Sequence, residues 1–345
     1  MSRPGLKLLN TKLTRLLGIK TPLVLPPMAG AAGGELAGQV SSAGGFGFLS
    51  AGYGATPDEF KRQLSLARAA LKTPPSGYPF PVGVGYLAWQ LEAPQSPVIE
   101  LISVALEHDV QAVWFSFGED LGRWIQLVRE NDARRGKKTI IFVQISTVKE
   151  ALVAVNEWKV DCIVAQGVES GGHGANYASP LLNLLPSILS SLPPNGPPIL
   201  AAGGLANGAH LASVLTLGAA GAVLGTRFLL AYESLYSHAQ RRALVAASSD
   251  LSAWDHARET LGWPAGIDGR GLRNSTVEDF EKGIDIEILK SKFREGLKNQ
   301  DTDRIIVWAG TGVGQMNQIQ TAKSIVEELH QDCIDHLAAV AEICS

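Results

Sequence analysis

The stretch VDCIVAQGVESGGHG (residues 160–174) joins an apolar segment to a glycine-rich loop. Residues 160–165 have the length and β-branched composition of a strand, and residues 167–174 contain four glycines. Glycine lets the main chain approach a ligand closely and leaves N–H groups free to face it. His173 is the side chain in the second half of the loop that can transfer a proton near neutral pH. An α/β barrel places its chemistry at such a strand end, although a surface turn remains the alternative.

The same alternation repeats along the chain on both sides of this stretch. Short apolar segments predict strands at residues 22–26, 46–50, 81–85, 111–115, 139–144, 160–165, 197–202 and 221–225. Apolar spacing predicts helices at residues 34–43, 57–71, 96–108, 120–132, 147–157, 180–191 and 206–217. This pattern favours a (β/α)8 TIM barrel over an open doubly wound sheet, because no GxGxxG motif follows the first predicted strand.

The alternation of predicted strands and helices stops after Phe228. Residues 232–300 are richer in charge and helix formers, and they predict a small, mainly helical insertion that covers the barrel mouth. Residues 304–310 and a last helix at about 315–343 then return to the barrel. The predicted division is therefore a cofactor-binding barrel of residues 1–231 and 301–345, with residues 232–300 as a lid that contacts the substrate.

The composition excludes several classes of protein. The 345 residues carry a net charge of −3 and no long basic block, so neither nucleic acid nor an anionic membrane surface is expected as a partner. No apolar run reaches about 18 residues, so no membrane span is expected. The three cysteines (Cys162, Cys333 and Cys344) lack CxxC or CxxH spacing, which favours a reducing compartment. The first 34 residues are basic, as transit peptides are, but the fold pattern begins by Thr21, so a cytoplasmic location is expected.

Three more glycine-bearing turns follow predicted strands. Residues 26–30 (PPMAG) follow the first strand, residues 201–208 (AAGGLANG) the seventh, and residues 225–227 (GTR) the eighth. The loops after strands 7 and 8 of a (β/α)8 barrel frequently bind phosphate through main-chain N–H groups. Thr226 can add a hydroxyl donor and cap the following helix. Two ordinary helix-starting turns are the alternative, but both turns lie where a phosphate site is expected.

Few side chains here could react without a cofactor. The seven histidines are scattered, and the sequence contains no HExxH, EF-hand or GxSxG motif. No lysine ends a strand, since the fifth predicted strand ends in Gln144 and Gln166 follows the sixth. The expected site combines one histidine with a phosphate cradle, and flavin mononucleotide (FMN) is a natural source of the missing chemistry.

These residues resemble the nitronate monooxygenases, formerly called 2-nitropropane dioxygenases. Relatives of that family include flavin-dependent enoyl-acyl-carrier-protein reductases and a group of NADH:quinone reductases. The most specific match is residues 166–173, which resemble the signature Gln-Gly-x-Glu-Ala-Gly-Gly-His with Ser170 at the alanine position. Further matching segments follow in the expected order, at residues 27–30, 43–47, 202–204, 225–228 and 306–312.

The resemblance implies that FMN lies across the carboxyl ends of the strands. It implies that Met28 and Ala29 line the isoalloxazine ring, that Gln144 reaches the ring or the ribityl chain, and that His173 faces both flavin and substrate. The implied cofactor-binding residues are Pro27, Met28, Ala29, Gly85, Gln144, Gln166, Gly171, Gly172, Ala202, Gly203, Gly204, Gly225 and Thr226. Of these, Gly203, Gly204, Gly225 and Thr226 would hold the phosphate. Many relatives carry a polar Asn after the third strand, where this chain has Val84-Gly85-Tyr86-Leu87.

The implied reaction is oxidation of an alkyl nitronate, or of the parent nitroalkane, by O2 to a carbonyl compound and nitrite. His173 would abstract a carbon-bound proton or hold the anionic nitronate. One alternative is an NAD(P)H-dependent flavin reductase acting on a quinone or an enoyl thioester. A second is an isomerase or lyase that binds a phosphorylated metabolite without flavin, and a non-catalytic binding protein is the weakest alternative. No metal is expected, and a homodimer remains open.

Overall fold

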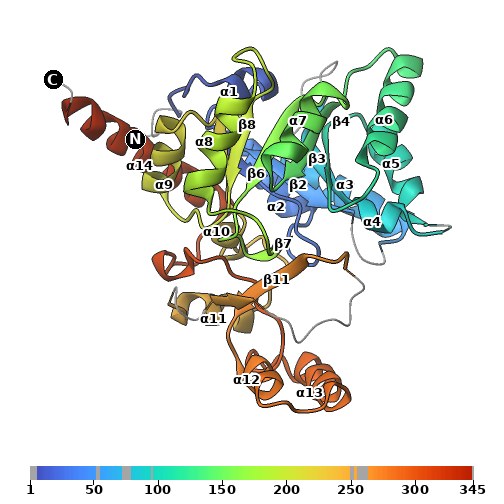
Figure 1. The fold of residues 1–345 in the computed structure, drawn as a ribbon, viewed down its shortest axis with the longest axis vertical. Helices are drawn as coiled ribbons and strands as arrows, with labels where there is room; N and C mark the ends of the chain where they lie inside the picture. The colour runs from blue at the N-terminus through green and yellow to red at the C-terminus, as the bar shows by residue number, and fades with distance from the viewer. Residues whose placement is uncertain are drawn as a thin grey trace.

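Eight parallel strands close into a barrel, as expected of a (β/α)8 fold (Figure 1). The computed structural model describes residues 6–51, 55–71, 79–94, 96–248, 263–343 and the backbone of 252–254. The barrel strands, in order, are β1 (Leu23–Leu25), β2 (Phe46–Ser50), β3 (Phe80–Leu87), β4 (Val110–Ser116), β5 (Ile140–Ile145), β6 (Cys162–Gln166), β8 (Ile199–Ala202) and β9 (Gly221–Val223). Pairing of Leu23 with Ala222 joins the first strand to the last and closes the ring.

Helices follow the strands in sequence and surround the barrel (Figure 1). They are α2 (Gly34–Ser42), α3 (Pro57–Ala70), α5 (Val98–Glu107), α6 (Leu121–Arg135), α7 (Val148–Asn156), α8 (Leu181–Ser191) and α9 (Gly208–Thr216). Three short helices were not predicted: α1 (Lys12–Leu17), α4 (Ala88–Leu91) and α10 (Thr226–Leu229). Local signals set several helix starts, as at α7, where Thr147 and Glu150 form a capping box.

The C-terminal helix α14 (Ala322–Ile343) completes the ring of helices. It packs between α9 and α2, and thus occupies the place of the helix that follows the last strand. Its buried face includes Ile325, Val326 and Leu329. The C-terminal helix thus packs against helices that surround the barrel. Within the described residues, no helix is both long and apolar enough to cross a membrane.

The interior of the barrel is filled with aromatic side chains. Phe48 contacts the rings of Phe46, Trp114 and Phe142 edge-on, with centroids 5.0–5.2 Å apart. Leu13 of α1 belongs to the same apolar cluster and closes the end at which the strands begin. The opposite end, where the strands finish and the glycine turns lie, opens to a cavity.

The insertion, residues 232–300, contains strands as well as helices. Its helices are α11 (His238–Ala246), α12 (Ser275–Glu281) and α13 (Ile286–Asn299). Strands β10 (Ser252–Trp254) and β11 (Ile267–Leu272) form a three-stranded antiparallel sheet with β7 (Gly172–Ala175). β7 is the second half of the glycine-histidine loop, so the insertion is joined to the predicted site by main-chain pairing, and Figure 1 shows β7 and β11 side by side.

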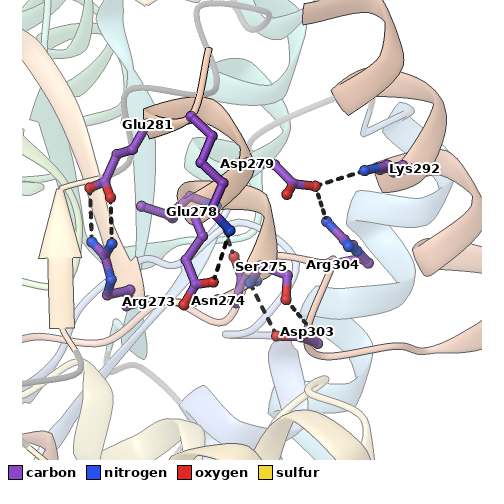
Figure 2. Close-up of polar contacts among 11 residues, drawn as sticks. Arg273, Asn274, Ser275, Glu278, Asp279, Glu281, Lys292, Asp303 and Arg304 are labelled. Atoms are coloured by element: carbon purple, nitrogen blue, oxygen red, sulfur yellow. Dashed lines mark hydrogen bonds and ion pairs between the residues drawn. The ribbon is translucent and has the colours of Figure 1, made fainter. Parts of the chain in front are cut away.

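A polar network holds α12 and α13 together as one unit (Figure 2). The Asp279 carboxylate accepts hydrogen bonds from Lys292 Nζ at 2.7 Å and from Arg304 Nη1 at 2.8 Å. Arg273, just before α12, pairs with Glu281, the last residue of that helix. The helix pair lies beyond β11, away from the barrel (Figure 1).

Candidate active site

A cavity of about 360 Å³ opens at the carboxyl end of the barrel. This is within the usual size range of small-molecule sites, about 300–1,000 Å³. The structure brings all of the predicted site residues to its lining: Pro27, Met28, Ala29, Gly85, Gln144, Gln166, Gly171, Gly172, His173, Ala202, Gly203, Gly204, Gly225 and Thr226. Residues from distant parts of the chain thus meet at one place, as the barrel topology requires.

The loop after β1 reaches the cavity by crossing the end of β3. Gly85 makes this crossing possible, because a Cβ atom there would clash with the ring of Pro27. The Met28 carbonyl then accepts hydrogen bonds from the main-chain nitrogens of Ala31 and Ala32, which turn the chain into α2. The apolar Gly85 is therefore a packing requirement of this loop.

Two glutamine side chains connect neighbouring strands to the histidine. Gln144 of β5 donates from Nε2 to Gln166 Oε1 of β6 at 2.6 Å. Gln166 in turn donates to the main-chain oxygen of His173 at 3.4 Å. Gln166 therefore faces the cavity and also ties the end of β6 to β7.

His173 lies on β7, opposite Gly269 of β11, with its ring against two tryptophans. The Trp263 ring stacks on the imidazole with centroids 3.6 Å apart and an interplanar angle of 11°. The Trp308 ring lies at 4.9 Å and is tilted by 60°. The sequence analysis missed both tryptophans as site residues. Trp308 falls in a segment that resembles the family, but Trp263 lies in the irregular centre of the insertion and carries no local signal.

Three glycine-containing loops meet main chain to main chain beneath the cavity. A Cβ atom at Gly171 would clash with the Gly310 nitrogen, and one at Gly312 would clash with the Gly204 oxygen. Gly203 and Gly204 have φ values of 117° and 67°, which glycine adopts without strain. The loop of residues 310–312 is a further part of the site that was not predicted, although Gly310 and Gly312 both line the cavity.

Thr226 lines the cavity, but it lacks one of the two roles predicted for it, that of a helix cap. It does not cap a helix, because it is itself the first residue of α10, and the preceding Gly225 has no side chain. Its Oγ1 instead accepts a hydrogen bond from the Gly310 nitrogen at 3.0 Å. The hydroxyl hydrogen of Thr226 stays available for an acceptor in the cavity, since a hydroxyl can donate and accept at once.

Ser170 and Glu169, inside the glycine-histidine loop, differ in how their oxygens are used. Both carboxylate oxygens of Glu169 accept from the Leu181 nitrogen, at 2.9 and 3.0 Å, and so hold the start of α8. Ser170 is 5% exposed, and the described residues offer its Oγ no hydrogen-bond partner. Leaving a buried hydroxyl unpaired costs about 1–3 kcal/mol, so a polar ligand atom in the cavity would relieve this cost.

A charged side chain that does not line the cavity, Arg270, contacts this loop. Arg270 of β11 donates to the Val168 oxygen at 3.4 Å, and burial lowers the pKa of its guanidinium, while Glu169 and Asp268 raise it. Within the described residues, no group of three or more His, Cys, Asp or Glu side chains gathers as metal ligands would.

Comparison with known proteins shows the family of this chain. The family model for nitronate monooxygenase matches residues 10–332. A nitronate monooxygenase of Metarhizium robertsii is 32% identical over 90% of both chains. Among solved structures, FabK of Thermotoga maritima has a TM-score of 0.79 and 26% identity over 97% of this chain and 99% of its own. A nitroalkane oxidase of Streptomyces ansochromogenes has a TM-score of 0.77 and 27% identity over 96% of this chain and all (100%) of its own. The chain therefore belongs to the nitronate monooxygenase family.

Proposed function

We propose that this protein is an FMN-dependent monooxygenase that oxidises alkyl nitronates with O2 to carbonyl compounds and nitrite. The observation that carries the proposal is a single cavity in which His173 lies beside the glycine loops of β6, β8 and β9. The names of the related proteins support the same reaction. The division into a cofactor-binding barrel and a substrate-contacting insertion belongs to the same proposal.

The cavity residues fit FMN. Gly203, Gly204 and Gly225 would present main-chain N–H groups to the phosphate, and Thr226 would add its hydroxyl. The amides of Gln144 and Gln166 and the unpaired hydroxyl of Ser170 would meet polar atoms of the ring or the ribityl chain. When bound, FMN supplies an electron acceptor for the nitronate and a partner for O2.

His173 would act on the substrate through an imidazole nitrogen. With a nitroalkane, that nitrogen would accept the carbon-bound proton, and with a preformed nitronate, the protonated ring would hold the anion by charge and hydrogen bonding. Pairing of β7 with β11 fixes the His173 main chain, and stacking on Trp263 fixes the plane of the ring. These contacts orient the ring before the substrate arrives, which lowers the cost of reaching the reactive geometry.

An anaerobic spectral titration tests this proposal. The purified protein is titrated first with NADH and then with ethyl nitronate while its visible spectrum is recorded. We expect a flavin band that is bleached by the nitronate and not by NADH. Bleaching by NADH would instead favour a reductase on the same fold. A protein that neither carries nor takes up flavin would favour the isomerase or lyase that binds a phosphorylated metabolite.

A cytoplasmic location is proposed on the use of cysteine. Cys162 and Cys333 are buried free thiols, and burial raises the pKa of Cys333 to about 11. Cys344 lies outside the described residues. Free thiols of this kind are usual in reducing compartments.

A further inference from the structure

Four aromatic side chains form one wall beside His173. The Trp263 ring stacks on His173. It also contacts the rings of Phe117, edge-on, and Trp89, with centroids 5.4 Å away in both cases. Trp308 lies against another side of the His173 ring. We call Trp89, Phe117, Trp263 and Trp308 the aromatic wall; Phe117, Trp263 and Trp308 line the cavity, and Trp89 contacts Trp263.

The members of the aromatic wall come from four separate parts of the chain. Trp89 belongs to α4 and Phe117 follows β4, so both lie at the barrel mouth. Trp263 precedes β11, and Trp308 lies on the return segment that pairs with β11 at Gly271. Neither barrel nor insertion alone makes this surface, which exists only where the two meet.

Phe117 is held in place against its own backbone preference. Its φ is 57°, in the left-handed region that a bulky residue rarely adopts. The Trp89 nitrogen donates to the Phe117 oxygen at 3.0 Å and stabilises this conformation. Strained residues of this kind persist only where the surrounding fold stabilises them, and they are concentrated at functional sites. The strain here directs an aromatic ring toward Trp263 and the cavity.

The cavity offers little to a second charged group on a substrate. Within the described residues, no Asp, Glu, Lys or Arg side chain lines it. His173 would already be engaged by the nitronate, so among the described lining residues a carboxylate elsewhere on the substrate would find no positive partner. Burying an unpaired charge is unfavourable, whereas a flat apolar group gains from contact with aromatic rings.

The geometry points to nitronates with an aromatic substituent as the preferred substrate class, with Trp263 as the specificity-determining residue. This inference rests on the proposed function and extends it. Trp263 covers one face of the His173 ring, so a nitronate held by that imidazole lies beside Trp263. The substituent then packs on the aromatic wall next to it.

The test compares three nitronates with the FMN-loaded enzyme. They are prepared from 1-nitro-2-phenylethane, 3-nitropropanoate and nitroethane, and kcat/KM is measured by oxygen uptake. We expect the phenyl compound to exceed the carboxylated one by at least about tenfold. Trp263→Ala should lower kcat/KM for the phenyl compound by about tenfold, mainly through KM, and should affect ethyl nitronate less.

Two further variants guard against a change in fold. Phe117→Asn removes the ring but tolerates the left-handed backbone, and it should weaken the phenyl preference in the same direction. Trp158→Ala removes a half-buried tryptophan that does not line the cavity, and it should leave all three substrates unchanged.

The outcomes separate this inference from the proposed function. If wild-type enzyme oxidises ethyl nitronate but shows no preference for the phenyl compound, the inference is overturned and the function stands. An equal loss on all three substrates in Trp263→Ala would also overturn it. If no nitronate is oxidised, the proposed function itself fails.

Discussion

His173 is the residue on which the proposed chemistry depends, and its main chain is held by contacts that do not involve its side chain. Main-chain pairing of β7 with β11 and the hydrogen bond from Gln166 both hold the backbone at this point. A substitution here should therefore change the chemistry and leave the fold intact.

His173→Asn should separate proton abstraction from the later steps. We expect FMN to stay bound and turnover of neutral nitroalkanes to fall by about 10²–10⁴-fold, because the base is lost. Turnover of preformed nitronates should fall less, since their proton has already left. Oxygen uptake with each form of the same compound measures both effects. Unchanged activity on both forms would remove His173 from the mechanism.

Ser170→Ala tests whether the unpaired hydroxyl serves the cofactor. The described residues give this hydroxyl no partner, so its loss should not lower the melting temperature. FMN affinity, measured by fluorescence quenching with the apoprotein, should fall by roughly two- to tenfold, the value of one hydrogen bond. Ser234→Ala is the control, because that buried hydroxyl accepts from the Tyr236 nitrogen and does not line the cavity. Equal FMN affinity in Ser170→Ala and wild type would show that the hydroxyl is not used.

At the scale of elements, the barrel strands and their helices could be predicted because their signals are local. β2, for example, lies at the predicted residues, and α3 differs from its prediction by one residue at its end. Strand β7 could not be predicted, because Gly172–Ala175 has the composition of a loop and becomes a strand only through β11, far along the chain.

The parts of the site that escaped prediction share this dependence on distant partners. Glycines and histidine in the 166–173 segment could be recognised from their spacing alone. Trp263 has meaning only once the insertion folds over His173, and the free hydroxyl of Ser170 follows from three-dimensional neighbours. Thr226 lies at the cavity, but the hydrogen bond that it accepts from Gly310 could not be predicted, because Gly310 is far along the chain.

The α12–α13 unit should open as one element when its central carboxylate is removed (Figure 2). Asp279→Ala takes away the acceptor shared by Lys292 and Arg304. We expect faster amide hydrogen exchange across residues 275–304 and no change in the barrel strands, because the network lies within this unit. Glu287→Ala removes only the exposed pair with Lys290 and serves as the control. Exchange that rises equally in the barrel would contradict an independent unit.

At the scale of the whole molecule, α14 contacts the segment that leads into β1. His330 of α14 is 1% exposed, and its Nδ1 lies 2.8 Å from Oγ1 of Thr21, just before β1. The described residues offer no partner to its Nε2. Burial lowers the pKa of His330 below its ordinary value, since a charged imidazole would be poorly solvated there.

Burial of His330 should make the stability of the protein depend on pH. Below the ordinary histidine pKa of about 6.5, the unfolded chain binds a proton at His330 that the folded chain resists, so stability falls as the pH falls toward the folded pKa. His210 contributes with the same sign, because burial lowers its pKa too. His330→Gln keeps a polar partner for Thr21 but cannot titrate, and it should reduce the loss of melting temperature between about pH 7.5 and pH 5.5. If the melting temperatures of wild type and His330→Gln fall by the same amount across this range, His330 does not contribute to the pH dependence of stability.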